Sequence, residues 1–282
     1  IAGCGQEVLC TPTNKQGCVA AEVLYAARRC GVTTVYKVGG AQAIAAMAYG
    51  TASVPKVDKI FGPGNRYVTL AKQLVAGRNT SIDMPAGPSE VMVLADESAD
   101  VRFVAADMLS QAEHGRDSQA IVVCSSQAIA EAVEAEVERQ RGLLARAEYV
   151  AESLANSRAI VFHSEEDMIA FAEEYAPEHL IVSMKEEWNV VGKISTAGSV
   201  FVGNYSPESA GDYASGTNHT LPTSGWAHSC SGVNIDSFMR KMTIQHLTPD
   251  GIKALAPTIV AMAEAEGLEA HAAAVRVRIE KS

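Results

Sequence analysis

The sequence lacks most of the features that mark membrane, secreted and nucleic-acid-binding proteins. None of its apolar runs reaches the ~18 residues that a membrane span needs, and no signal peptide is recognisable. Basic residues are the minority, with 23 Lys and Arg against 33 Asp and Glu, so the formal net charge is −10. This balance argues against a nucleic-acid surface and against binding to anionic lipid. It leaves an anionic small ligand open, because main-chain N–H groups alone can hold a phosphate.

Cysteine is also scarce, and no two cysteines form a C-x-x-C pair. A chain of 282 residues with six cysteines argues against a disulfide framework. We therefore expect buried free thiols and a reducing compartment, the cytoplasm of a microbe. A plastid protein whose transit peptide has been removed would have the same composition. The six are Cys4, Cys10, Cys18, Cys30, Cys124 and Cys230.

The apolar pattern that is present is typical of an α/β fold. Short apolar runs alternate with helix-period runs, which predicts βαβ units and mostly parallel sheets. Strands are expected at 7–10, 32–38, 57–62, 91–96, 119–125, 159–163, 179–184 and 198–203. Helices are expected at 19–31, 41–50, 65–77, 99–115, 128–157, 165–176, 249–267 and 269–280. In such sheets ligands collect at the carboxyl ends of strands, so we expect the site there.

A possible metal site lies where the helix predicted at 99–115 ends in LSQAEHG. Gln111 and His114 are three residues apart and share a helix face, so both could grip one ion. The alternative is that His114 caps the end of the helix, where a cationic imidazole interacts favourably with the helix dipole.

An acid and a base stand side by side in APEHL, at Glu178 and His179. Proton transfer needs such a pair. Adjacent side chains of an extended segment point to opposite faces, so both reach one site only if the chain bends, which Pro177 permits. Because isolated Glu-His pairs are common, a purely structural role stays open.

A polar segment at 206–225 follows the last predicted strand and has almost no apolar content. Structureless loops of this length inside a compact domain are usually functional. It carries Glu208, Asp212, Asn218 and His219, and the distant segment EAEGLEAH adds Glu266 and His271.

Two glycine-rich turns, at 38–43 and 61–65, lead from predicted strands into helices and could bring main-chain N–H groups to an anion. Neither has the spacing G-x-G-x-x-G, so ordinary tight turns are the simpler interpretation. The segment 82–91 is interpreted either as a structural turn or as a ligand-facing loop with Ser89 exposed.

Taken together, these segments resemble the histidinol dehydrogenases from one end of the chain to the other. The resemblance rests on seven motifs in the family's order: GGAQAIAAMAYGT, VDKIFGPGN, IDMPAGPSEV, LSQAEHG, APEHL, GSVFVGNYSPESAGDYASGTNHTLPT and EGLEAHAAAV. It implies two incomplete Rossmann-like domains with mostly parallel sheets and a helical C-terminal tail. We place an NAD-binding part at 1–91, a domain with metal and catalytic residues at 92–230, and a tail that crosses a homodimer at 231–282.

The resemblance also implies an activity, which is the oxidation of L-histidinol to L-histidine through histidinal, with two NAD⁺ reduced. One Zn²⁺ per subunit would be held by Gln111, His114, Asp212 and His271, the last from the partner's tail. His179 would be the general base, and Glu178 would help to activate water. Substrate contacts are implied for Ser89, His219 and Glu266, and NAD contacts for Gln42 and Asn65.

Members of this family are longer at the N-terminus, so we expect this chain to lack that region, including a tyrosine that contacts the cofactor. Three other functions stay open. They are a zinc- and NAD-dependent alcohol dehydrogenase for a different substrate, a zinc hydrolase, and a truncated subunit without catalytic activity. The chain could equally be part of a longer multifunctional polypeptide.

Overall fold

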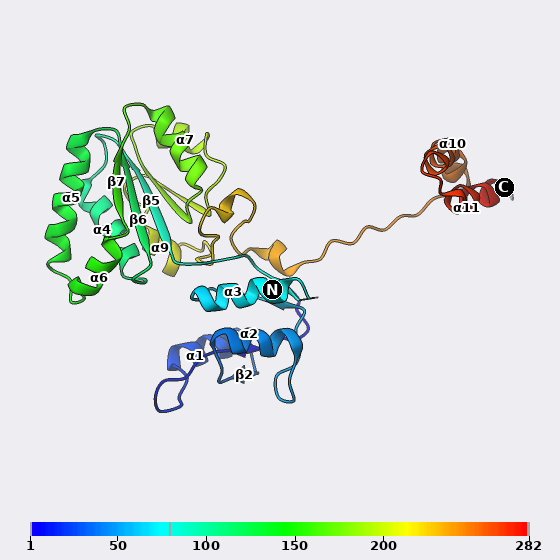
Figure 1. Ribbon diagram of the computed structural model, residues 1–282, viewed down its shortest axis with the longest axis horizontal. Coiled ribbons are helices and arrows are strands. Elements are labelled where there is room, and N and C mark those ends of the chain that lie inside the picture. The colour runs from blue at the N-terminus through cyan, green and yellow to red at the C-terminus, as the bar shows by residue number, and fades with distance from the viewer. Residues whose placement is uncertain (1, 79, 281–282) are drawn as a thin grey trace. The chain divides into compact units, whose positions relative to one another are not determined.

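The computed structural model describes residues 2–78 and 80–280 (Figure 1). It divides into two compact units, Ile1–Phe238 and Met239–Ser282, which are described separately. No described helix is long and apolar enough to cross a membrane. The predicted domain boundaries at residues 91 and 230 stay a prediction.

The first part of the larger unit contains two short parallel strand pairs and three helices. Strand β1 (Leu9–Cys10) pairs with β2 (Val35–Tyr36), and β3 (Lys59–Ile60) pairs with β4 (Ser81–Ile82). The helices are α1 (Ala21–Arg29), α2 (Gly40–Tyr49) and α3 (Arg66–Ala76). Their apolar core includes Ile44, Met47, Val54, Ile60 and Val75.

A five-stranded, wholly parallel sheet forms the rest of this unit, in the order β7-β6-β5-β8-β9. The strands are β5 (Glu90–Ala95), β6 (Gln119–Cys124), β7 (Arg158–Val161), β8 (His179–Ser183) and β9 (Ser199–Val202). The helices between them are α4 (Val101–Ala112), α5 (Gln127–Arg141), α6 (Ala147–Leu154), α7 (Glu165–Tyr175) and α8 (Glu187–Val191).

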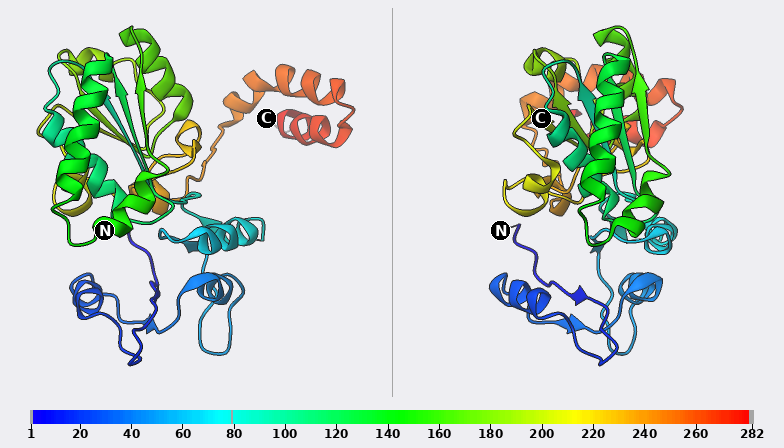
Figure 2. Two further views of the ribbon diagram at one scale, coloured as in Figure 1. Left: turned by 60° about the vertical axis from the view of Figure 1, so that its left-hand side comes forward. Right: turned by 90° about the vertical axis from the view of Figure 1, so that its left-hand side faces the viewer.

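Helices cover both faces of this sheet (Figures 1 and 2). Val91 and Val93 of β5 pack with α4, α5 and α6, whereas Met92 and Leu94 pack with α7 and α8. Successive side chains of a strand point to opposite faces, so a strand covered on both faces is apolar throughout. This explains why β5 and β6 appear in the sequence as continuous apolar runs.

The smaller unit is a pair of helices, α10 (Pro249–Ala265) and α11 (Glu269–Glu280), that pack against each other. Thr248 caps α10, since its hydroxyl accepts a hydrogen bond from the N–H of Gly251 at 3.1 Å, and Pro249 occupies the first turn. Ala256, Ala263 and Ala272 are buried between the helices. The prediction of an α/β fold with a helical C-terminus is confirmed.

Two local predictions were wrong. The segment 206–225 is not structureless, because α9 (Glu208–Tyr213) forms within it and packs on α4. The main-chain N–H of Glu208 donates to the Asp107 carboxylate of α4, a contact that no local pattern reveals. The cysteines are free within the described residues, but only Cys124 is buried; Cys4, Cys18 and Cys30 are exposed because they lie in thinly covered N-terminal segments.

Candidate metal and acid–base site

The acid–base pair lies where β8 begins, next to the start of β5. Glu178 Oε2 accepts a hydrogen bond from the main-chain N–H of Glu90 at 2.8 Å. Nδ1 of His179 lies 3.0 Å from the main-chain oxygen of Glu90 and 3.5 Å from Glu178 Oε2. Ala176, with φ 52°, supplies the bend in the chain before the strand. The side chains of Glu178 and His179 therefore both contact one residue, Glu90, of the neighbouring strand β5.

The imidazole of His179 is placed to act as a base. A carbonyl oxygen accepts only, so Nδ1 carries the proton and Nε2 keeps its lone pair. Nε2 is buried and has no hydrogen-bond partner within residues 2–78 and 80–280. Burial lowers the pKa of His179. The bond to Glu90 and the charge of Asp212 oppose this shift, and the nearby His114 and His219 add to it. The ring is therefore neutral at neutral pH.

A second cluster forms where α4 ends beside α9. Nε2 of His114 lies 3.5 Å from Glu208 Oε1 and 3.7 Å from Asp212 Oδ2. Glu208 and Asp212 are four residues apart on α9, so both carboxylates lie on one helix face. One ligand atom from each of His114, Glu208 and Asp212 fits within 4.8 Å of the others. Gln111 is the fully buried residue one turn before His114.

Burial and the crowding of acids raise the pKa values of several carboxyl groups in and beside this cluster. Burial, with the charges of Asp212 and Asp107, raises the pKa of Glu208 to about 8. Burial raises the pKa of Asp107 to about 7. The pKa of Glu178 is also raised well above its usual value, chiefly by burial and further by Glu90, Glu208 and Asp212.

A divalent metal ion fits these residues. Both oxygens of Glu208, and the amide oxygen and nitrogen of Gln111, are buried without a hydrogen-bond partner in the described part of the chain. Buried polar atoms are normally satisfied, and the three oxygens among these four atoms are acceptors that a cation would satisfy. One imidazole with oxygen donors is a set that zinc accepts.

The site lies at the amino edge of the five-stranded sheet, and the prediction of the carboxyl edge was wrong. Glu90 and His179 are the first residues of β5 and β8. His114 follows the carboxyl end of α4, just before β6. The rule for open parallel sheets concerns helix N-termini and the loops that lead to them. Here His114 follows the C-terminal end of α4, and Glu178 and His179 follow that of α7.

Comparison with known proteins decides the family. The sequence model of the family "Histidinol dehydrogenase" matches residues 1–279. The chain belongs to the histidinol dehydrogenase family. It is 59% identical over 281 residues to a histidinol dehydrogenase of Bacteroides fragilis (strain YCH46), covering 100% of this chain and 66% of that protein. It is 55% identical over 283 residues to that of Aliivibrio fischeri, covering 100% of this chain and 64% of that protein.

A solved structure agrees. The crystal structure of histidinol dehydrogenase from Elizabethkingia anophelis superimposes with a TM-score of 0.96 at 52% identity, covering 99% of this chain and 64% of that one. The chain therefore spans slightly less than two thirds of the length of these relatives.

The remaining positions implied by the histidinol dehydrogenase resemblance lie in three places. Ser89 directly precedes Glu90 and is partly buried, and His219 is exposed. Gln42 and Asn65 are exposed at the starts of α2 and α3, and Asn65 caps α3 through its side-chain oxygen. Glu266 and His271 belong to the smaller unit, where both are exposed.

Glu208 and Asp107 were not assigned a role from the sequence. If a helix had been expected at 208–213, the four-residue spacing would have indicated that Glu208 shares a helix face with Asp212. Asp107 precedes Gln111 by four residues on α4, the same spacing.

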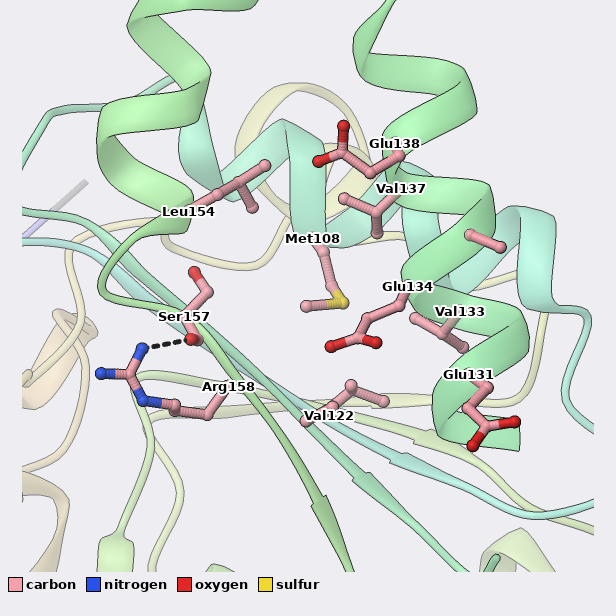
Figure 3. A pocket seen from close by; sticks show the side chains of 12 residues that line it. Met108, Val122, Glu131, Val133, Glu134, Val137, Glu138, Leu154, Ser157 and Arg158 are labelled. Carbon is pink, nitrogen blue, oxygen red and sulfur yellow. Dashed lines mark hydrogen bonds between the residues drawn. The ribbon is translucent and has the colours of Figure 1, made fainter. Parts of the chain in front are cut away.

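A separate cavity of about 540 Å³ lies between α5 and β7 (Figure 3). Its lining includes Met108, Val122, Glu134 and Arg158, and none of the site residues. It plays no part in the site.

Proposed function

We propose that the protein oxidises L-histidinol to L-histidine through histidinal, using NAD⁺ and zinc. Family membership supports the substrate and the reaction class. The observation that carries the chemistry is the buried His179, whose Nδ1 faces a carbonyl oxygen and whose Nε2 is left to accept a proton. A neutral imidazole in this tautomer is what abstraction of an alcohol proton requires.

In the first half-reaction, Nε2 of His179 takes the hydroxyl proton of histidinol as the carbinol carbon loses a hydride. NAD⁺, held by Gln42 and Asn65, would supply the hydride acceptor for each half. The Glu90 carbonyl group holds the imidazole through Nδ1 while the ring gains its positive charge. The Glu178 carboxylate, 3.5 Å from Nδ1, stabilises that imidazolium.

In the second half-reaction, a water adds to the aldehyde. Glu178 is the group placed to take its proton, because its raised pKa makes the ionised form a stronger base than an ordinary carboxylate. The N–H of Glu90 fixes one of its oxygens. The other oxygen is left to face the water.

Zinc would be held by Gln111, His114 and Asp212, with Glu208 beside them. When bound, it supplies a fixed positive charge that orients the imidazole and amino nitrogens of the substrate. We propose that His271 of a second copy completes the ligand set and that Glu266 and Ser89 contact the substrate. Gln42 and Asn65 would contact the dinucleotide, in agreement with their place at the starts of two helices.

The first test counts NADH formed per L-histidinol consumed by the zinc-loaded full chain, beside a chelator-treated sample. Two NADH per histidinol, lost on chelation and restored by zinc, is the expected result. Zinc binding without any NADH would contradict the proposed substrate or the cofactor site.

A further inference from the structure

A buried ion pair lies in the first part of the larger unit, away from the acid–base site. Lys72 of α3 contacts Asp83, which follows β4, and their side chains are 2% and 0% exposed. A buried ion pair is poor evidence of stabilisation, because desolvation offsets much of the attraction. The pair therefore matters through the groups that it holds in place.

The pair holds both main-chain polar groups of one glycine. Lys72 Nζ donates to the carbonyl oxygen of Gly62 at 2.8 Å, and the N–H of Gly62 donates to Asp83 Oδ2 at 2.8 Å. Gly62 has φ +127°, a conformation that L side chains rarely adopt. Asp83 is itself fixed, since its Oδ1 accepts from the N–H of Met84 at 2.8 Å.

Gly62 belongs to the loop 61–65, whose last residue is the N-cap of α3. Asn65 Oδ1 accepts from the N–H groups of Tyr67 and Val68 at 3.1 and 3.2 Å. One turn before Lys72, the Thr69 hydroxyl donates to the carbonyl oxygen of Ala86. The same face of α3 therefore fixes both this loop and the segment that leads to Ser89.

We propose that Lys72 and Asp83 are positioning residues that hold residues 61–65 in the conformation that receives the dinucleotide. The inference rests on the proposed function, in which Asn65 contacts NAD⁺. The physical reason is preorganisation. A loop whose main chain is already ordered loses less conformational entropy when a ligand binds, so its affinity is higher.

The experiment compares NADH binding, by fluorescence and without histidinol, in the zinc-loaded full chain and in the double variant Lys72→Met/Asp83→Asn. Neutralising both partners avoids leaving one buried charge unpaired. The matched control is Lys193→Met/Glu165→Gln, which neutralises a surface ion pair with an N–O distance of 2.8 Å. Zinc content and the KM for histidinol are measured on each protein.

We expect the Kd for NADH to rise about tenfold, equivalent to about 1.4 kcal/mol, in the double variant. Zinc content and the histidinol KM should stay at the wild-type values, and the control should bind NADH as the wild type does. A folded double variant with the wild-type Kd would overturn the inference. A wild type that binds no NADH would instead contradict the proposed function.

A second variant covers the case in which the double variant does not fold. In Gly62→Ala the new Cβ would meet no described atom within 4 Å, so it acts through the main-chain conformation alone. The same weakening of NADH binding is expected. Wild-type affinity in folded Gly62→Ala would overturn the inference by itself.

Discussion

The main-chain oxygen of Glu90 lies 3.0 Å from Nδ1 of His179. The N–H of the same residue donates to Glu178 at 2.8 Å, so one residue of β5 orients both members of the acid–base pair. The Glu90 side chain in turn accepts from the N–H of Ser224 at 3.0 Å. Ser224 has φ 55°, an uncommon conformation outside glycine, and this bond holds it. The main-chain N–H and carbonyl groups of Glu90 therefore position both side chains of the pair.

Replacing His179 by Asn should lower kcat by roughly 10²–10⁴, because the amide cannot accept the hydroxyl proton. Zinc should remain bound, since no contact of His179 with the metal cluster is among the described hydrogen bonds and ion pairs. Steady-state kinetics and metal analysis test both statements. Loss of zinc in this variant would place His179 in the metal site instead.

The metal cluster is tested by His114→Asn and Glu208→Gln. His114→Asn should abolish zinc binding. Glu208→Gln should weaken it by roughly 10–100-fold, the usual cost of changing a group beside a metal ligand. Competition with a chelator measures both. The matched control is Glu186→Gln, an exposed carboxyl of α8's N-cap. Unchanged zinc content in His114→Asn would remove His114 from the ligand set.

The rate should depend on pH through His179. Its pKa lies below the usual 6.5, chiefly because burial disfavours the charged ring. The base form therefore persists at pH 6.5, and the acid limb of kcat/KM should lie below that value. The unfolded chain binds this proton more readily, so the contribution of His179 is present above pH 6.5 and is lost as the pH falls. A limb above pH 6.5 that persists in Glu178→Gln would contradict the assignment.

The proposed exchange of tails between subunits is tested by complementation. His179→Asn and His271→Asn are each inactive in this proposal. Unfolding, mixing and refolding the two in equal amounts should restore about a quarter of the wild-type activity, because half of the dimers then contain one intact site. Each variant refolded alone is the control. Failure of the mixture to regain activity would show that His271 serves its own subunit, whereas an active His271→Asn control would show that it serves no site.

Gly198 allows a close approach of two main-chain segments. A Cβ there would lie 2.5 Å from the carbonyl oxygen of Glu178. Gly198→Ala should therefore lower the free energy of unfolding by ~1–3 kcal/mol. Gly142→Ala is the control, since Gly142 has φ −61° and ordinary spacing from its neighbours. Urea denaturation measures both. Equal stability of Gly198→Ala and the wild type would show that the two segments do not need this close approach.

Much of the fold could be predicted from the sequence, because a helix or strand that is buried on one or both faces has a periodic or continuous pattern of apolar residues. Strand β6 was expected at 119–125 and spans Gln119–Cys124, and α11 was expected and found at 269–280. The strands in the first part of the larger unit are shorter than predicted. An apolar run at 32–38 contains only the two-residue strand Val35–Tyr36, because its partner β1 extends no further.

What the sequence determined by itself is the alternation of helices and strands, and the family, through ordered motifs. The tertiary structure alone decided that Glu208 joins His114 and Asp212 in one cluster, and that this cluster lies at the amino edge of the sheet. The physical reason is the separation along the chain over which each kind of interaction acts. Periodicity and capping act over a few residues, whereas α4 and α9 are joined across about a hundred residues by packing and by the Asp107 contact. The local sequence around the polar residues of 206–225 does not indicate that this segment packs on α4.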